Sequence, residues 1–175
     1  AVFNGRIAVI EDKNASSSLR IYDVKTGKEV DNVSFDSHVS LYGLIAVPRS
    51  DTFYYSLGSF FYPASHYSYK DGKSHLFYKP ELDLDSDKFQ SKLVWYKSKD
   101  GTKVSMFILS KKDIEISEKT PVTLGGYGGF GVSITPSFSP EIITWLVQGG
   151  VVATPHLRGG GDYGQEWHHA GYRDN

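Results

Sequence analysis

The first 81 residues alternate short apolar runs with polar turns. Period-2 alternation and a wealth of β-branched and aromatic residues predict strands at 6–10, 19–24, 41–47, 52–57, 67–69 and 75–78. Turns such as Lys25-Thr26-Gly27-Lys28 separate them. Such a series is typical of a sandwich, a barrel or propeller blades. Because one blade takes roughly 40 to 50 residues, we expect fewer than two blades here, and a propeller closes only with at least about four.

From residue 82 onward the pattern changes to strands alternating with a helix. The polar stretch 80–88 is the predicted boundary between two domains, residues 1–81 and 82–175. The Asp100-Gly101 pair is a strong turn signal, and strands are predicted on both sides of it and further along, at 93–97, 104–109, 121–124 and 151–154.

A helix is predicted between the last two of these strands. Ser139 supplies a hydroxyl cap, Pro140 suits the first helical position, and Glu141 faces the positive end of the helix. Strand, helix and strand in this order predict the start of an open α/β sheet. In such sheets ligands bind at the loops that follow the carboxyl ends of strands.

Composition removes several classes of function. A net charge of -1 gives no electrostatic reason to expect nucleic acid or an anionic membrane as a partner. There are no cysteines, so disulfides and thiolate metal sites are excluded, and a reducing cytoplasmic location is the default expectation. No stretch approaches the roughly 20 apolar residues of a membrane span, and the start of the chain does not look like a signal peptide.

Two short patterns resemble ligand sites without completing them. Asp83, Asp85 and Asp87 start like a calcium loop, but Lys88 replaces the required glycine and Val94 the required glutamate. We therefore expect a solvated linker and no metal. Gly126, Gly128 and Gly131 spell G-x-G-x-x-G, yet the β-branched segment 132–136 follows where a dinucleotide cradle needs a helix. No nucleotide cofactor is expected.

The glycine-dense stretch 125–131 follows a strand, as does a second cluster at Gly159-Gly160-Gly161. So many glycines indicate a turn shaped for a site rather than for packing, with Tyr127 in its middle. His156, His168 and His169 lie near the second cluster and are interpreted as structural or solvent-exposed, with the two adjacent rings pointing in different directions. The chain contains no G-x-S-x-G nucleophile elbow.

Longer motifs are more specific. Gly126-Tyr127-Gly128-Gly129-Phe130, the run 133–139 and the run from Arg158 to His168 occur in order, preceded by Lys99 to Phe107. Together they closely resemble the prolyl oligopeptidase family of serine peptidases. The resemblance is strong over about residues 92–175 and weaker over 1–91. It implies a mixed α and β protein fragment, the last one to two blades of a β-propeller followed by the N-terminal portion of an α/β-hydrolase domain.

The resemblance also implies roles for two residues. In the family, the tyrosine at the position of Tyr127 donates its hydroxyl to the oxyanion of the tetrahedral intermediate, and the phenylalanine matching Phe130 lines the pocket for proline. Substrates would be short proline-containing peptides, cut after proline, and no cofactor is implied. The family usually has tyrosine where Gly125 stands, and it commonly has asparagine near His156 with no proline like Pro155 before it.

The family's nucleophilic serine, aspartate and histidine all correspond to positions downstream of Asn175. Because a serine triad works only when all three groups are present, residues 1–175 alone are expected to be inactive and to need the remainder of the hydrolase domain and propeller. The alternative is a non-catalytic, β-rich binding or interaction module derived from such an enzyme.

Overall fold

The computed structural model describes residues 1–172, and the chain divides into two compact units. Unit 1 holds Ala1–Asp83 together with Pro136–Phe138, and unit 2 holds Leu84–Thr135 and the chain from Ser139 on. Residues 136–138 thus lie in the predicted second domain by sequence but pack with unit 1. The assignment of residues 1–81 to a partial propeller and of 82–175 to a hydrolase domain stays a prediction.

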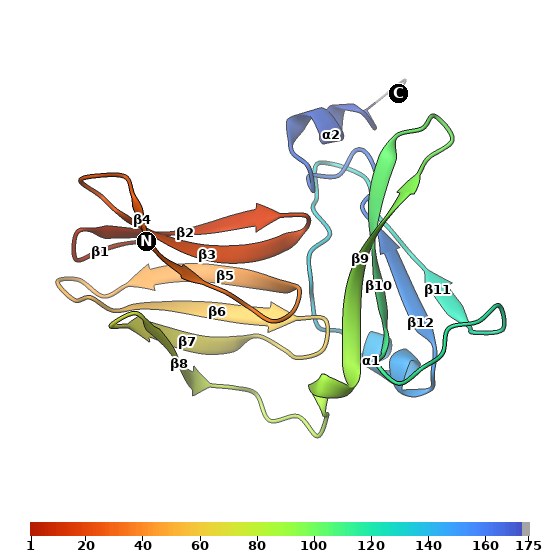
Figure 1. Ribbon diagram of the computed structural model, residues 1–175, viewed down its shortest axis with the longest axis horizontal. Coiled ribbons are helices and arrows are strands. Elements are labelled where there is room, and N and C mark those ends of the chain that lie inside the picture. Colours follow the sequence, from red (N-terminus) through yellow and green to blue (C-terminus); the bar gives the residue numbers. More distant parts are fainter. Residues whose placement is uncertain (173–175) are drawn as a thin grey trace. The chain divides into compact units, whose positions relative to one another are not determined.

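Unit 1 consists of two four-stranded antiparallel sheets, each with its strands in sequence order (Figure 1). The first contains β1 (Val2–Phe3), β2 (Arg6–Lys13), β3 (Ser16–Asp23) and β4 (Glu29–Val33). The second contains β5 (Val39–Ala46), β6 (Phe53–Ser59), β7 (Ser65–Lys70) and β8 (Lys73–Tyr78). Unit 1 thus holds two four-stranded sheets, where the length of the segment led us to expect fewer than two blades. The first sheet takes only residues 2–33, because its turns are short and its strand β1 has two residues.

The core of unit 1 lies between these sheets, as strand alternation dictates. On β6, Phe53 and Tyr55 are buried while Tyr54 between them is exposed. The ring of Tyr69 stacks on Phe53 with centroids 4.7 Å apart, and its hydroxyl donates to the Asp31 carboxylate. Burial raises the pKa of Tyr69, so this buried hydroxyl remains a donor.

Pro136 anchors the detached segment of unit 1. It is one of the largest fully buried side chains of the described residues. Its carbonyl oxygen accepts hydrogen bonds from Ser40 Oγ at 2.7 Å and from the Tyr42 hydroxyl at 3.3 Å. The chain that leaves the first glycine stretch is thus fixed on strand β5.

Unit 2 is built on one mixed sheet with strand order β11-β12-β10-β9 (Figure 1). Its elements are the 3-10 helix η1 (Ser86–Lys88), β9 (Phe89–Lys97), β10 (Lys103–Lys111), β11 (Val122–Leu124), α1 (Pro140–Val147), β12 (Val151–Pro155) and α2 (Gln165–His169). β11 pairs with β12 in parallel, and β10 is antiparallel to both β12 and β9. The predicted order of strand, helix and strand is confirmed.

Helix α1 forms for the predicted reasons. Ser139 Oγ accepts a hydrogen bond from the Ile142 backbone N–H at 3.3 Å, and Pro140 begins the helix. Ile143 and Leu146 are buried, and Trp145 Nε1 donates to the Val151 carbonyl at 3.0 Å. These contacts tie the helix to the start of β12.

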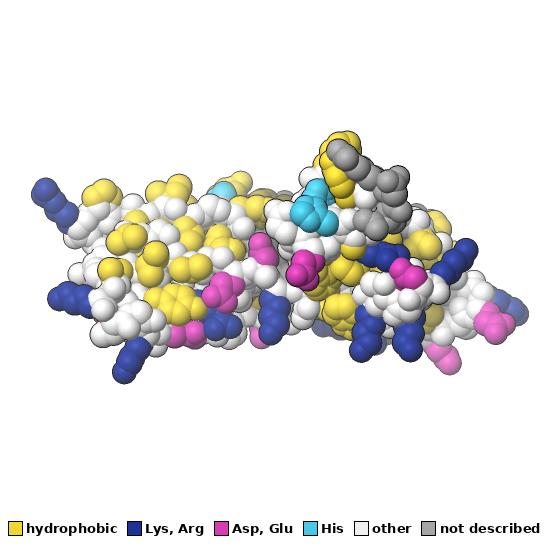
Figure 2. Space-filling model, turned by 90° about the horizontal axis from the view of Figure 1, so that it is seen from above, with side chains coloured by type: hydrophobic (Ala, Val, Ile, Leu, Met, Phe, Trp, Pro, Cys, Tyr) yellow, Lys and Arg dark blue, Asp and Glu magenta, His cyan; other side chains and the backbone are white. Residues whose placement is uncertain are grey.

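The surface agrees with the charge balance of the sequence. On the face shown in Figure 2, lysine and arginine side chains are scattered and interspersed with acidic ones. Among residues 1–172, no helix is both long and apolar enough to cross a membrane.

Candidate functional site

Two glycine-rich loops lie side by side in unit 2. The first glycine loop (125–131) follows β11, and the second glycine loop (158–164) follows β12, so the parallel pairing brings both to one edge of the sheet. Tyr127 forms a parallel bridge with His156. Beyond it, the Gly131 N–H donates to the Gly159 carbonyl at 3.0 Å, and the Gly161 N–H donates to the Val132 carbonyl at 3.1 Å.

The glycines allow these loops to touch backbone to backbone. A Cβ on Gly128 would lie 2.5 Å from Leu157 Cβ, and one on Gly159 would lie 2.2 Å from the Gly128 carbonyl oxygen. A Cβ on Gly161 would lie 2.3 Å from the Gly131 carbonyl oxygen. Each of these three glycines is therefore required by close packing between the loops, whatever role the first glycine stretch has as a turn shaped for a site.

Gly125 differs from the glycines around it. It is exposed, and a Cβ built on it meets nothing within 4 Å. A tyrosine at this position, which the resemblance noted above implies, would begin in open space. Glycine in its place therefore is not required by the packing of the first glycine loop.

Tyr127 lies on the outer side of the first glycine loop with 45% of its surface exposed. Its ring covers Gly129, where a Cβ would come within 3.0 Å of the tyrosine hydroxyl. Within the described residues, this hydroxyl has no side-chain or backbone hydrogen-bond partner. Tyr127 therefore presents a free donor on a loop whose backbone is fixed by its neighbour.

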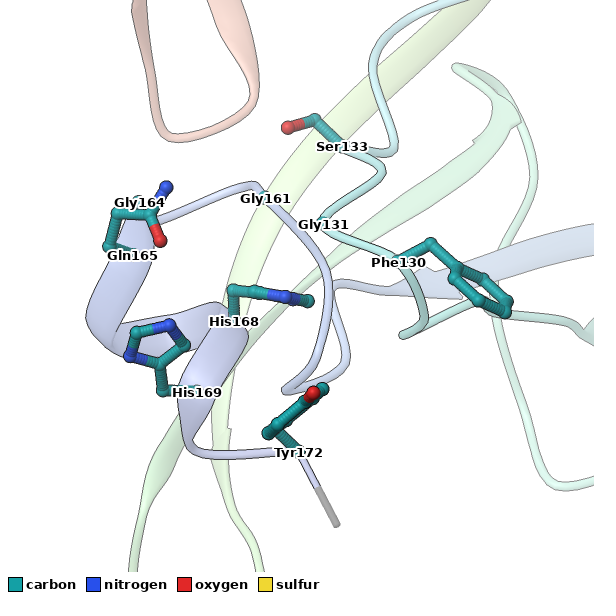
Figure 3. Close-up of a pocket in the computed structure, with 9 residues that line it drawn as sticks. All are labelled: Phe130, Gly131, Ser133, Gly161, Gly164, Gln165, His168, His169 and Tyr172. Atoms are coloured by element: carbon teal, nitrogen blue, oxygen red, sulfur yellow. The ribbon is translucent and has the colours of Figure 1, made fainter.

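Phe130 stands at the rim of a different feature. It is 91% exposed and has a left-handed backbone with φ of 56°. It borders an open pocket of about 650 Å³, whose other lining residues are Gly131, Ser133, Gly161, Gly164, Gln165, His168, His169 and Tyr172. Figure 3 shows the Phe130 ring pointing away from helix α2. Tyr127 does not line this pocket, so the structure places the two predicted site residues on one loop but not around one cavity.

His168 and His169 both line this pocket, and Figure 3 shows their rings pointing in different directions, as expected for adjacent residues. Their ring centroids are 5.7 Å apart. Consecutive positions of a helix are separated by about 100°, so the two side chains leave the short helix α2 in different directions. His168 Nδ1 lies 2.7 Å from the Gly159 carbonyl, so this imidazole also holds the second glycine loop.

His156 is fully buried below the loops. Its Nδ1 lies 2.7 Å from Ser105 Oγ, and Ser105 also hydrogen-bonds the Tyr163 hydroxyl. The ring packs edge-on against Phe107 with centroids 4.8 Å apart. Burial lowers the pKa of His156, although the Asp162 carboxylate acts in the opposite direction. The imidazole is therefore neutral at neutral pH, and it packs in the interior below the two glycine loops.

Arg158 connects the second glycine loop to the turn between β9 and β10. Its guanidinium forms an ion pair with Asp100 and lies 3.4 Å from both Thr102 Oγ1 and Ser98 Oγ. The Thr102 backbone N–H and the Arg158 guanidinium lower the pKa of Asp100 to about 2.

Sequence reasoning did not single out Ser105, Asp162 or Tyr163, although the last two directly follow the second glycine cluster.

Comparison with known proteins gives consistent matches. The model of the family described as "Prolyl oligopeptidase family" matches residues 136–175. The chain is 37% identical to a prolyl endopeptidase of Elizabethkingia miricola over 91% of this chain and 23% of that protein. It is 33% identical to prolyl oligopeptidase A of Galerina marginata over 99% of this chain and 24% of that protein.

Solved structures agree. A prolyl endopeptidase structure superposes with a TM-score of 0.86 and 37% identity, covering 98% of this chain and 25% of the other. Prolyl oligopeptidase B from Galerina marginata, bound to a 35mer hydrolysis and macrocyclization substrate, gives a TM-score of 0.85 and 30% identity, covering 95% of this chain and 24% of the other. The strand-rich architecture thus matches these propeller-like structures. The chain spans about a quarter of the length of the proteins it matches.

Proposed function

Because this chain belongs to the prolyl oligopeptidase family of serine peptidases, as a segment of it, we propose that it is part of a serine endopeptidase that cuts short peptides after proline. In this proposal residues 1–81 are the last blades of the propeller, and residues 82–175 begin the α/β-hydrolase domain. Peptide-bound relatives such as prolyl oligopeptidase B of Galerina marginata support a peptide substrate.

The free hydroxyl of Tyr127 is the observation that carries this proposal. It is half-exposed and has no partner among residues 1–172, while the bridge to His156 fixes the backbone beneath it. A hydrogen-bond donor that is held in place but has no partner in the protein can stabilise a negative charge that develops only during the reaction. We therefore assign Tyr127 the family's role of donating to the oxyanion of the tetrahedral intermediate.

Phe130 is assigned to the wall of the proline pocket. An apolar ring that is 91% exposed contributes little to the stability of unit 2 and is available to a ligand. The nucleophilic serine, the aspartate and the histidine would come from the rest of the hydrolase domain. Residues 1–175 by themselves are therefore proposed to bind no peptide productively and to hydrolyse none.

Tyr127→Phe in the complete protein tests the assignment, because this change removes only the hydroxyl. Losing one oxyanion donor typically costs a factor of about 10² to 10³ in turnover, so kcat on a proline-containing peptide should fall about a hundredfold with KM little changed. Tyr96→Phe is the matched control, since Tyr96 is also a partly exposed tyrosine of unit 2, at 37%, but lies on β9.

Two results would count against the proposal. Unchanged turnover of Tyr127→Phe, in a preparation that cuts proline peptides, would remove the oxyanion role. A complete polypeptide with no G-x-S-x-G motif and no hydrolysis would favour the non-catalytic interaction module instead.

A further inference from the structure

Asp162 is the side chain through which the second glycine loop holds the segment after Tyr127. Its Oδ1 accepts a hydrogen bond from the Ile134 backbone N–H at 2.7 Å. The preceding contacts between the two segments are made by backbone groups, from Gly131 to Gly159 and from Gly161 to Val132. Asp162 thus adds a side-chain hydrogen bond at one end of a ladder whose other end is the bridge between Tyr127 and His156.

The second carboxylate oxygen has little freedom. Oδ2 is buried, and it lies so close to Gly160 that a Cβ there would be 2.7 Å away. Oδ2 has no hydrogen-bond partner among the described residues. The carboxylate also lies within electrostatic reach of the buried His156 ring. A carboxylate confined in this way keeps its other oxygen aimed at the Ile134 N–H without needing to be ordered on substrate binding.

We propose that Asp162 is a positioning residue for the proposed peptidase reaction, which fixes the Tyr127 loop by holding Ile134. It acts through the loop and does not touch the substrate. The inference rests on the proposed function, because it concerns the placement of the Tyr127 hydroxyl. Small displacements of a catalytic group lower turnover more than they lower substrate binding.

Asp162→Ala in the complete protein removes the acceptor. We expect kcat for a proline-containing peptide to fall about 10- to 100-fold, with KM within about twofold of the wild-type value. Asp162→Asn keeps an acceptor oxygen and should recover most of the loss. Asp85→Ala is the matched control, because Asp85 Oδ1 likewise accepts a backbone N–H, from Asp87 at 3.2 Å, but caps η1.

A mutant cycle with Tyr127→Phe separates positioning from general destabilisation. If Asp162 acts through the Tyr127 hydroxyl, Asp162→Ala should lower kcat by less than about twofold once that hydroxyl is gone. An equal loss in both backgrounds, or unchanged kcat in the single Asp162→Ala variant, would overturn the inference. If Asp162→Ala does not fold, Asp162→Ser is tested in its place. The serine hydroxyl is attached one bond closer to the backbone than the carboxylate oxygens, so it does not reach the Ile134 N–H.

Hydrogen exchange supplies a readout that does not depend on activity. Asp162→Ala should speed exchange in a peptide covering 132–138 and leave a peptide covering β9 unchanged. Unchanged exchange at Ile134 would also overturn the inference. If Tyr127→Phe alone has no effect on turnover, the oxyanion role proposed for Tyr127 fails, whereas faster exchange would still show that Asp162 holds the loop.

Discussion

Gly128→Ala probes the central claim that the two glycine loops need direct backbone contact. The added Cβ would lie 2.5 Å from Leu157 Cβ and 2.7 Å from the Arg158 carbonyl oxygen. Neither is the far end of a flexible side chain, so the backbone of one loop must move. Gly128 does not have a positive φ, which means that the substitution adds no backbone strain of its own.

The magnitude follows from two opposing effects. Overpacking in a well-packed region costs about 1–3 kcal/mol, while replacing glycine by alanine at an allowed φ stabilises by about 0.4–1 kcal/mol through the unfolded chain. The net expectation is a loss of about 1–2 kcal/mol in the free energy of opening the loop pair. Such a loss raises the open population by a factor of about 5 to 30.

Native-state hydrogen exchange measures this opening locally, which avoids treating the unfolding of a large protein as a single transition. The reporters are the amides of Gly131 and Gly161, which donate across the two loops. Gly125→Ala is the control, because its Cβ meets nothing within 4 Å, and its exchange should match the wild type. Equal exchange in Gly128→Ala and Gly125→Ala would refute the close packing that we describe.

Two further predictions concern Phe130 and His156. Phe130→Ala should leave the melting temperature unchanged, because the ring is 91% exposed in the free protein. It should lower kcat/KM for proline peptides about 10- to 100-fold, because the ring would be buried against the bound substrate. A wild-type kcat/KM would argue against a pocket wall. Burial lowers the pKa of His156, so the unfolded chain binds a proton below about pH 6.5 that the folded chain does not. Stability should therefore fall as the pH drops from about 6.5 toward the lowered pKa, and melting curves of His156→Asn should lose that part of the pH dependence.

The strands and the first helix could be predicted because their signals are local. The Asp100-Gly101 turn, the Ser139 cap and the alternation on β6 each depend on neighbours within a few residues, and all are found in the structure. The family could also be inferred, since its motifs are long and ordered. Helix α2 and η1 were not predicted, because five and three residues are too few to show a helical period.

The features that sequence reasoning missed depend on contacts between distant segments. Asp162 and Ile134 are separated by 28 positions, and Ser105 and His156 by 51. The residues next to Asp162 in the sequence do not show that its carboxylate holds a distant backbone N–H. Asp162 can accept the Ile134 N–H only because the parallel pairing of β11 and β12 brings the two loops together.

The glycines of the two loops are required for different physical reasons. Gly128, Gly159 and Gly161 exclude a side chain because backbone atoms of the other loop occupy its place, and Gly131 has a φ of +66° that disfavours one. Gly125 meets neither condition, so a side chain could be placed there without a close contact or backbone strain. The number of glycines therefore did not reveal the site. What matters for Tyr127 is that the tightly packed glycines on its C-terminal side fix the backbone, while its own ring stays on the open side of the loop.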